Sequence, residues 1–180
     1  MERQLAGAAR GLGRLISPAA VPVKGAFKSP VNVVLGEDVR DGPCPLFVGR
    51  YIRGVKNGRS PEWLQTRLRA VGLRPISALV DVTNLLTYDR NRPLHVFDAD
   101  KLSGDIEVRL AKKGETLMAL DDKEYRFDGT EVLICDAAGG QSIGGIMGGL
   151  ETSCTYETVN VFVEAAYFEP VRVAASGRKH

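Results

Sequence analysis

The stretch R-P-I-S-A-L-V-D-V-T-N-L-L-T-Y-D-R-N-R-P-L-H-V-F-D-A-D, residues 74–100, packs polar side chains closely among apolar ones. Ser77 is a suitable N-cap, and apolar residues recur after it at helical spacing, which predicts a helix from about 78 to 89. A turn and a short extended run at 93–98 follow this helix. We therefore expect a helix–turn–strand unit here, and we take it as the centre of a site.

Polar groups of chemical use lie within this unit. The helical spacing places Asp81 and Asn84 on one face with Thr83 beside them, so that a carboxylate, an amide and a hydroxyl share one edge. His95, in the extended run, is one of only two histidines. The pattern leaves two interpretations of His95 open: a neutral histidine satisfied by the backbone or by Asp98, or a residue of a site.

The cysteines argue against a zinc centre. Cys44, Cys135 and Cys154 are scattered without C-x-x-C spacing, and no second histidine lies near His95. An odd number of cysteines without framework spacing predicts free thiols in a reducing compartment, with the cytoplasm as the default. The chain has no apolar run of 18 residues, so we expect no membrane partner.

Composition limits the class of protein. Of 180 residues, 44% are hydrophobic and 26% are charged, which is ordinary for a globular domain with a sizeable core. The formal net charge of +2 neither demands nor excludes nucleic acid, so any such contact must be local. Arg67, Arg69 and Arg74 are candidates for phosphate contacts, although such charges also commonly form a solvated face.

Two segments are expected along the chain. Residues 1–28 read as an amphipathic helix over about 5–16 followed by a proline-containing connector. Residues 29–180 read as the main domain. The opening segment and the cationic end of the chain predict that the sequence is a piece of a longer protein.

The remaining pattern predicts an α+β fold with a mostly antiparallel sheet and three to four packed helices. Ser60 and Pro61 predict a second helix over about 61–71, with Ser60 as N-cap, and a further helix begins near Pro170. Short β-type runs with close turn signals support the antiparallel sheet; they are expected at 31–35, 45–52, 106–110, 116–120, 124–127, 132–135 and 158–168.

A glycine-rich run and an acid within an apolar strand are two further candidates. Residues 141–149 carry four glycines but form neither a P-loop nor a dinucleotide fingerprint, so a flavin or nucleotide enzyme is not supported. Glycines let a ligand approach the backbone closely, although many such runs only make bulges. Glu164 stands among apolar residues, and it is either paired with a cation or kept for a ligand hydroxyl.

Taken together and in this order, four motifs resemble the tRNA-editing domain of the β subunit of bacterial phenylalanyl-tRNA synthetases. They are P-I-S-A-L-V-D-V-T-N at 75–84, R-P-L-H-V-F-D-A-D-K-L at 92–102, G-G-I-M-G-G at 144–149 and V-F-V-E-A-A-Y-F-E-P at 161–170. Any one motif alone would be a weak signal. The resemblance covers nearly all of residues 29–179.

This resemblance implies a hydrolase that cleaves the ester of mischarged Tyr-tRNA(Phe). It implies that the partners are the tRNA(Phe) 3′ end carrying tyrosine and the α subunit of the synthetase. It also implies that editing needs no cofactor, since ATP and Mg²⁺ serve aminoacylation outside this chain. The implied roles are catalytic for His95, Thr83 and Asn84, and substrate-binding for Glu164, which accepts the tyrosine hydroxyl, and for Gly145 and Gly148, which form a glycine wall.

A charged acceptor at Glu164 would favour tyrosine over phenylalanine by roughly 1.5–3 kcal/mol. We expect His95 to position groups by hydrogen bonding, with general-base catalysis as a lesser possibility. The family continues past Arg178 with residues that help to close the pocket. A second hypothesis follows from this: a non-catalytic module that docks tRNA or packs against another subunit.

Overall fold

The structure is a computed structural model, and it describes residues 7, 10–11 and 21–180. Most of the expected helices and strands are present in this part of the chain. The strands are β1 (Val33–Leu35), β2 (Leu46–Ile52), β3 (His95–Asp98), β4 (Ile106–Leu110), β5 (Thr116–Met118), β6 (Glu124–Arg126), β7 (Val132–Asp136), β8 (Gly139–Ile143), β9 (Met147–Gly148) and β10 (Val161–Tyr167). The helices are α2 (Glu62–Ala70), α3 (Ala78–Arg90) and α4 (Pro170–Lys179).

The strands form three sheets. The largest has the order β1-β4-β7-β8-β9, the second has the order β2-β10-β3, and β5 pairs with β6 alone. Strand β1 runs parallel to β4, with Val33 opposite Ile106, whereas the other pairs in the three sheets are antiparallel. The largest sheet is therefore mixed.

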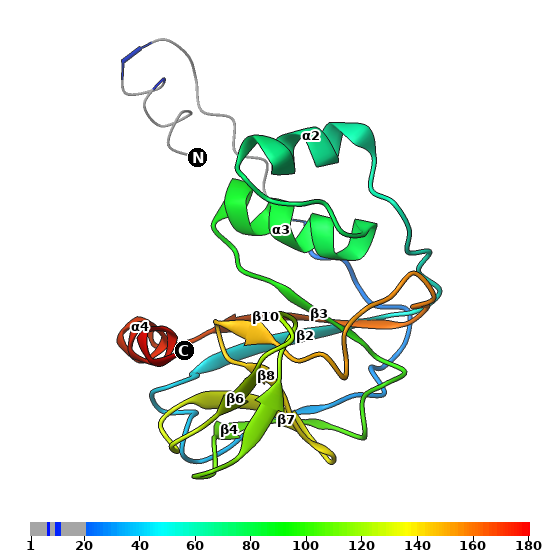
Figure 1. Ribbon diagram of the computed structural model, residues 1–180. Coiled ribbons are helices and arrows are strands. Elements are labelled where there is room, and N and C mark those ends of the chain that lie inside the picture. Colours follow the sequence, from blue (N-terminus) through cyan, green and yellow to red (C-terminus); the bar gives the residue numbers. More distant parts are fainter. Residues whose placement is uncertain (1–6, 8–9, 12–20) are drawn as a thin grey trace.

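The helices lie at two separate places around the sheets. Helices α2 and α3 lie together above the β2-β10-β3 sheet, with the large sheet on its other side, while α4 lies apart from them, beyond the end of β10 (Figure 1). The pair α2–α3 is tied together by Asp81, which is fully buried and accepts hydrogen bonds from the Ser60 hydroxyl and from the Ile76 backbone amide at 2.8 Å. This carboxylate fixes the start of α3.

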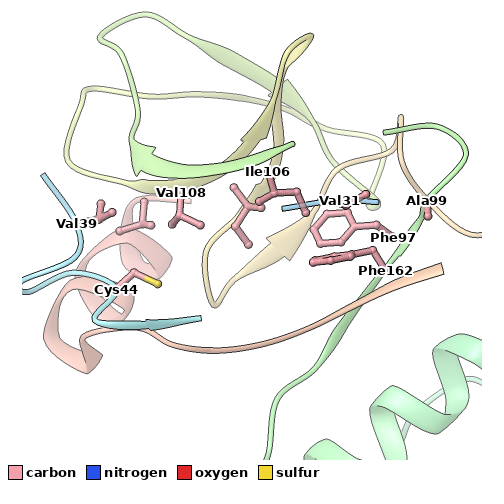
Figure 2. Packing of buried hydrophobic residues seen from close by; sticks show 10 residues of the cluster. Val31, Val39, Cys44, Phe97, Ala99, Ile106, Val108 and Phe162 are labelled. Carbon is pink, nitrogen blue, oxygen red and sulfur yellow. The ribbon is translucent and has the colours of Figure 1, made fainter. Parts of the chain in front are cut away.

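The main core fills the space between the two larger sheets. Phe97 of β3 and Phe162 of β10 lie beside Ile106 of β4, and Val108 of β4 lies farther along the same cluster, toward Val39 (Figure 2). These five side chains are almost completely buried. A Cβ atom at Gly49 of β2 would collide with the Phe162 ring. Glycine in the middle of β2 is therefore explained by this close approach.

The expectation of a mostly antiparallel sheet with three to four packed helices was wrong. The strands divide among three sheets, the largest sheet contains a parallel pair, and the three described helices do not form one layer on a sheet. The physical reason is that alternation along a strand shows which face is buried, but says nothing about the direction of its partner. The β1–β4 pair joins segments that the local pattern cannot connect.

Several local expectations also changed. The glycine-rich run was given no secondary structure, yet it contains the end of β8 and all of β9, which pair antiparallel. Ser60 is not the N-cap of α2, because Pro61 occupies that position and the Ser60 hydroxyl bonds to Asp81. The N-terminal helix expected over 5–16 lies outside the described residues.

Candidate active site

His95 and Glu164 are direct cross-strand partners. His95 opens β3, Glu164 lies in the middle of β10, and the antiparallel register places the two residues opposite each other. Side chains in such a position lie on the same face with Cβ atoms about 4.5–5.5 Å apart. Residues far apart in the sequence thus share one place in the fold.

Both side chains carry a buried polar atom without a hydrogen-bond partner. In the described part of the chain, neither Nε2 of His95 nor Oε2 of Glu164 has one. Burial lowers the pKa of His95 to about 4 and raises the pKa of Glu164 to about 8, because burial disfavours the charged form of each group. Both groups are therefore neutral at pH 7, and both are free to bond with a ligand.

The structure does not support the interpretation in which Asp98 satisfies His95. The Asp98 carboxylate accepts a hydrogen bond from the Thr158 hydroxyl at 2.6 Å, and an offset of three residues along a strand places it on the other face. The His95 ring packs edge-on against Phe97, with ring centroids 4.4 Å apart. This packing holds the imidazole in place and leaves Nε2 unbonded.

The alternative in which Glu164 is paired with a cation also finds no support. Within the described residues, no Lys, Arg or His nitrogen makes an ion pair with Glu164, although the side chain is only 6% exposed. A buried acid without a partner is costly unless it stays protonated or meets a ligand. Of the two interpretations of Glu164, the one in which the acid is kept for a ligand hydroxyl fits the structure.

A cavity of about 830 Å³ opens in front of this pair. Its walls are the loop before β3, the β8–β9 hairpin, the end of β10 and the first turns of α4. His95, Glu164, Gly145 and Gly148 all line it, so four of the six predicted site residues come together. A volume of this size is typical of small-molecule sites.

The two glycines are required by close contacts at the cavity wall. A Cβ atom at Gly148 would stand 2.9 Å from Nε2 of His95 and 3.0 Å from Leu120. Gly145 has a φ of 72°, and a Cβ atom there would stand 3.2 Å from the Phe168 ring. Gly148 therefore makes room for the imidazole, and Gly145 makes room for the aromatic wall.

Helix α4 supplies a wall that sequence reasoning did not assign to the site. Its N-cap Glu169 accepts hydrogen bonds from the Val171 and Arg172 backbone amides at 3.0 and 2.7 Å. This cap places Val173 against the cavity next to Phe168. The apolar run ending at Phe168 was the available signal, but its length predicted only a strand.

Thr83 and Asn84 lie elsewhere. Both are on α3, neither lines the cavity, and the Thr83 hydroxyl donates to the Val80 carbonyl at 2.8 Å. The helix ends at Arg90, and Asn91, with a φ of 51°, turns the chain into the cavity wall. Helix α3 thus positions the loop before His95, and the catalytic roles of Thr83 and Asn84 remain a prediction.

The cysteines are free thiols, as the sequence predicted. Burial, together with the charge of Glu164, raises the pKa of Cys44 to about 11, and burial raises the pKa of Cys154 to about 11. Such thiols stay protonated at pH 7 and are poor nucleophiles.

Among the described residues, no group of three or more His, Cys, Asp or Glu side chains is placed to hold a metal ion. No helix in this part of the chain is long and apolar enough to cross a membrane.

Comparison with known proteins defines the class. Residues 43–180 match the B3/4 domain family, and the chain therefore belongs to this family. The sequence is similar to phenylalanine–tRNA ligase β subunits: it is 60% identical over 171 residues to that of Ruegeria pomeroyi and 55% identical over 171 residues to that of Cereibacter sphaeroides. The predicted resemblance is confirmed.

These matches cover most of this chain but a small part of the relatives. They span 95% of the chain and 21% of each of the two β subunits. A solved N-terminal fragment of the phenylalanyl-tRNA synthetase β subunit from Pyrococcus horikoshii has a similar fold, with a TM-score of 0.60 at 18% identity. That likeness covers 88% of this chain and 51% of the other.

Proposed function

We propose that this domain hydrolyses the ester bond of tRNA(Phe) mischarged with tyrosine. The observation that carries the proposal is the orphaned pair of His95 and Glu164 on one wall of the 830 Å³ cavity. A buried acid and a half-buried histidine whose buried Nε2 has no partner are costly in a fold that keeps them only for packing. A ligand with its own polar groups offsets that cost.

The cavity suits an aromatic amino acid. Gly145, Gly148, Ala166 and Phe168 give an apolar lining, and Glu164 supplies one polar group for the far end of a side chain. A site built to bond a hydroxyl rejects the analogue that lacks it, because the buried polar group then stays unpaired. Tyrosine meets this condition, whereas phenylalanine leaves Glu164 without a partner.

The protonation state of Glu164 changes the expected size of this preference. The sequence-based expectation assumed a charged acceptor, but a pKa of about 8 keeps the acid protonated at pH 7. A protonated carboxyl group can both donate to and accept from a phenol. A neutral hydrogen bond contributes about 0.5–1.5 kcal/mol, so we expect a smaller preference at pH 7 than the charged form would provide.

His95 acts in this scheme by hydrogen bonding. A pKa of about 4 makes the imidazole a weak base at pH 7 and supports a positioning role for Nε2. Water attacks the ester carbonyl carbon, the bond to the ribose oxygen breaks, and that oxygen takes up a proton. The products are tyrosine and an RNA with a free 3′-terminal hydroxyl. The ester is already reactive, so orienting the water and steadying the oxyanion suffice.

The rest of the RNA lies outside the cavity in this proposal. Arg92 lines the cavity as an exposed cation, which suits a phosphate near the RNA terminus. Thr83 and Asn84 keep their proposed roles around the ester and the terminal adenosine. As part of a β subunit, the domain works beside an α subunit in the cytoplasm, and ATP and Mg²⁺ serve only the aminoacylation reaction there.

The test is hydrolysis of Tyr-tRNA(Phe) and Phe-tRNA(Phe) by this chain, followed as release of the labelled amino acid. We expect faster release of tyrosine, and strong loss of that release in His95→Ala and Glu164→Ala. Glu157→Ala is a matched control, since Glu157 is an exposed glutamate away from the cavity. Binding of tRNA without release of tyrosine would contradict the proposal and support a non-catalytic docking module.

A further inference from the structure

A second hollow lies along the free edge of the β2-β10-β3 sheet. Its volume is about 370 Å³, and it is enclosed by the connector around Lys24 to Ser29 and by residues 49–53 of β2 and the position after it. Strand β2 lies at one edge of this sheet and β3, which carries His95, lies at the other. The hollow is therefore separate from the proposed active site.

The charged side chains that line this hollow are all cationic. They are Lys24, Arg50 and Arg53, and no carboxylate is among the lining residues. In the described part of the chain none of the three makes an ion pair. Arg50 donates from both terminal nitrogens to the Val23 carbonyl at 3.1 Å, which holds its guanidinium at the surface. The positive charge is thus uncompensated.

Aromatic rings lie between these cations. The Arg53 guanidinium stands 4.2 Å from the centroid of the Phe27 ring and 5.7 Å from that of Tyr51. The two rings meet edge to face, 6.3 Å apart, and Phe27 is 44% exposed. A planar cation over an exposed ring offers flat surfaces on which a nucleobase can stack.

Two other surface arginines are neutralised by a neighbouring acid. Arg69, named from the sequence as a candidate for phosphate, pairs with Glu62 at 3.0 Å on the same helix. Arg59 also pairs with Glu62, at 3.4 Å. Arg67 of α2 makes no ion pair with the described residues, and its guanidinium stands 5.4 Å from the centroid of the Trp63 ring. The β2 edge differs from α2 because three such cations line one hollow there.

We propose that Lys24, Phe27, Arg50 and Arg53 form a binding surface for an RNA strand. The cations contact backbone phosphates and the exposed ring stacks with a base, as in surfaces that bind nucleic acid without reading its sequence. This proposal rests on the proposed function in one respect: the function in tRNA editing is the reason for choosing RNA as the anionic partner of these cations. The surface raises the affinity for RNA and takes no part in ester hydrolysis.

The test measures binding of fluorescein-labelled, unacylated tRNA(Phe) transcript to the full chain by anisotropy across a salt series. We expect Arg50→Gln/Arg53→Gln to weaken binding and to flatten the plot of log affinity against log salt by about 0.7–0.9 for each phosphate that the variant no longer neutralises. Phe27→Leu should reduce affinity by about fivefold or more with an unchanged salt slope.

The matched control is Lys112→Gln/Lys113→Gln, which removes the same charge from exposed residues in the turn between β4 and β5. Equally weakened binding in the control and in the double arginine variant would overturn the proposal, as would an unchanged slope in the arginine variant. Arg53→Gln alone leaves the Arg50 hydrogen bonds to Val23 in place, and circular dichroism checks that each variant is folded. Because the RNA carries no amino acid, a failure of hydrolysis would not affect this result.

Discussion

His95 and Glu164 face each other across the β3–β10 ladder, and burial moves their pKa values in opposite directions. Between about pH 4 and pH 8 both are neutral, so the pair can exchange hydrogen bonds with a neutral substrate without a buried charge. Outside this range one of the two becomes charged in a site that offers no counter-ion among the described residues. The pH behaviour of the domain therefore reports on this pair.

Glu164→Gln should alter the pH dependence of stability. The pKa of Glu164 is about 8 in the folded state against an ordinary value of 4.5. Between these two pH values, the folded state therefore binds one proton more than the unfolded state. The stability linked to that proton is fully present below pH 4.5 and is lost as the pH rises through about 8. Glutamine has the shape of the protonated acid and does not titrate.

We therefore expect the stability of Glu164→Gln, relative to the parent chain, to improve by a few kcal/mol, up to about 4, between about pH 5 and pH 8.5. Urea unfolding at several pH values measures this difference. Glu157→Gln, an exposed substitution, should leave the curve unchanged. A constant difference between Glu164→Gln and the parent chain would show that Glu164 is not held protonated.

The lowered pKa of His95 affects stability at lower pH. The stability linked to it is present above pH 6.5 and is lost as the pH falls through about 4.

Discrimination between tyrosine and phenylalanine should grow as the pH rises through about 8. Ionised Glu164 accepts a stronger hydrogen bond from the tyrosine hydroxyl, whereas a phenyl ring leaves the new charge unsolvated. The difference between charged and neutral hydrogen bonds, about 1 kcal/mol, corresponds to about a fivefold change. Calorimetry with non-hydrolysable tyrosyl and phenylalanyl adenosine analogues on either side of that pKa, at about pH 6.5 and about pH 8.5, measures it. In Glu164→Gln the ratio should not vary with pH.

Gly148→Ala should displace the His95 imidazole. The added Cβ would stand 2.9 Å from Nε2 and 3.0 Å from Leu120, so either the ring or the β9 backbone must move. We expect loss of ester hydrolysis and a destabilisation of about 1–3 kcal/mol, typical of overpacking. Gly42→Ala is the control, because nothing lies within 4 Å of its added Cβ and its φ is not positive. Normal hydrolysis by Gly148→Ala would show that the reaction does not depend on the position of the His95 imidazole.

Asn84→Ala tests the role assigned to α3. Asn84 does not line the cavity, so we expect this change to raise KM for Tyr-tRNA(Phe) more than it lowers kcat. His95→Ala should show the reverse pattern, with a large fall in kcat. Steady-state hydrolysis at several RNA concentrations separates the two effects. An equal fall in kcat for both variants would show that Asn84 acts in the chemical step itself and not mainly in binding the RNA.

Local signals predicted individual elements better than their assembly. Helical spacing after Ser77 predicted α3, alternation predicted β10, and the turn ending at Pro93 predicted the short extended run at His95. The pairing of His95 with Glu164 depends on the register of β10 with β3, which no local pattern encodes. The predicted group also included Thr83, which faces its own helix rather than the cavity. Phe168 and Val173 were missed because a wall built from an aromatic ring and a helix start has no distinctive spacing.

The parallel pair β1–β4 sets an order of events during synthesis on the ribosome. Val33 meets Ile106 only after β2, α2, α3 and β3 have all been made. Closing so long a loop is slow compared with forming a local helix pair. The β1 edge therefore stays unpaired while β2, α2, α3 and β3 are made, and the α2–α3 pair can assemble well before the sheet that it covers is complete.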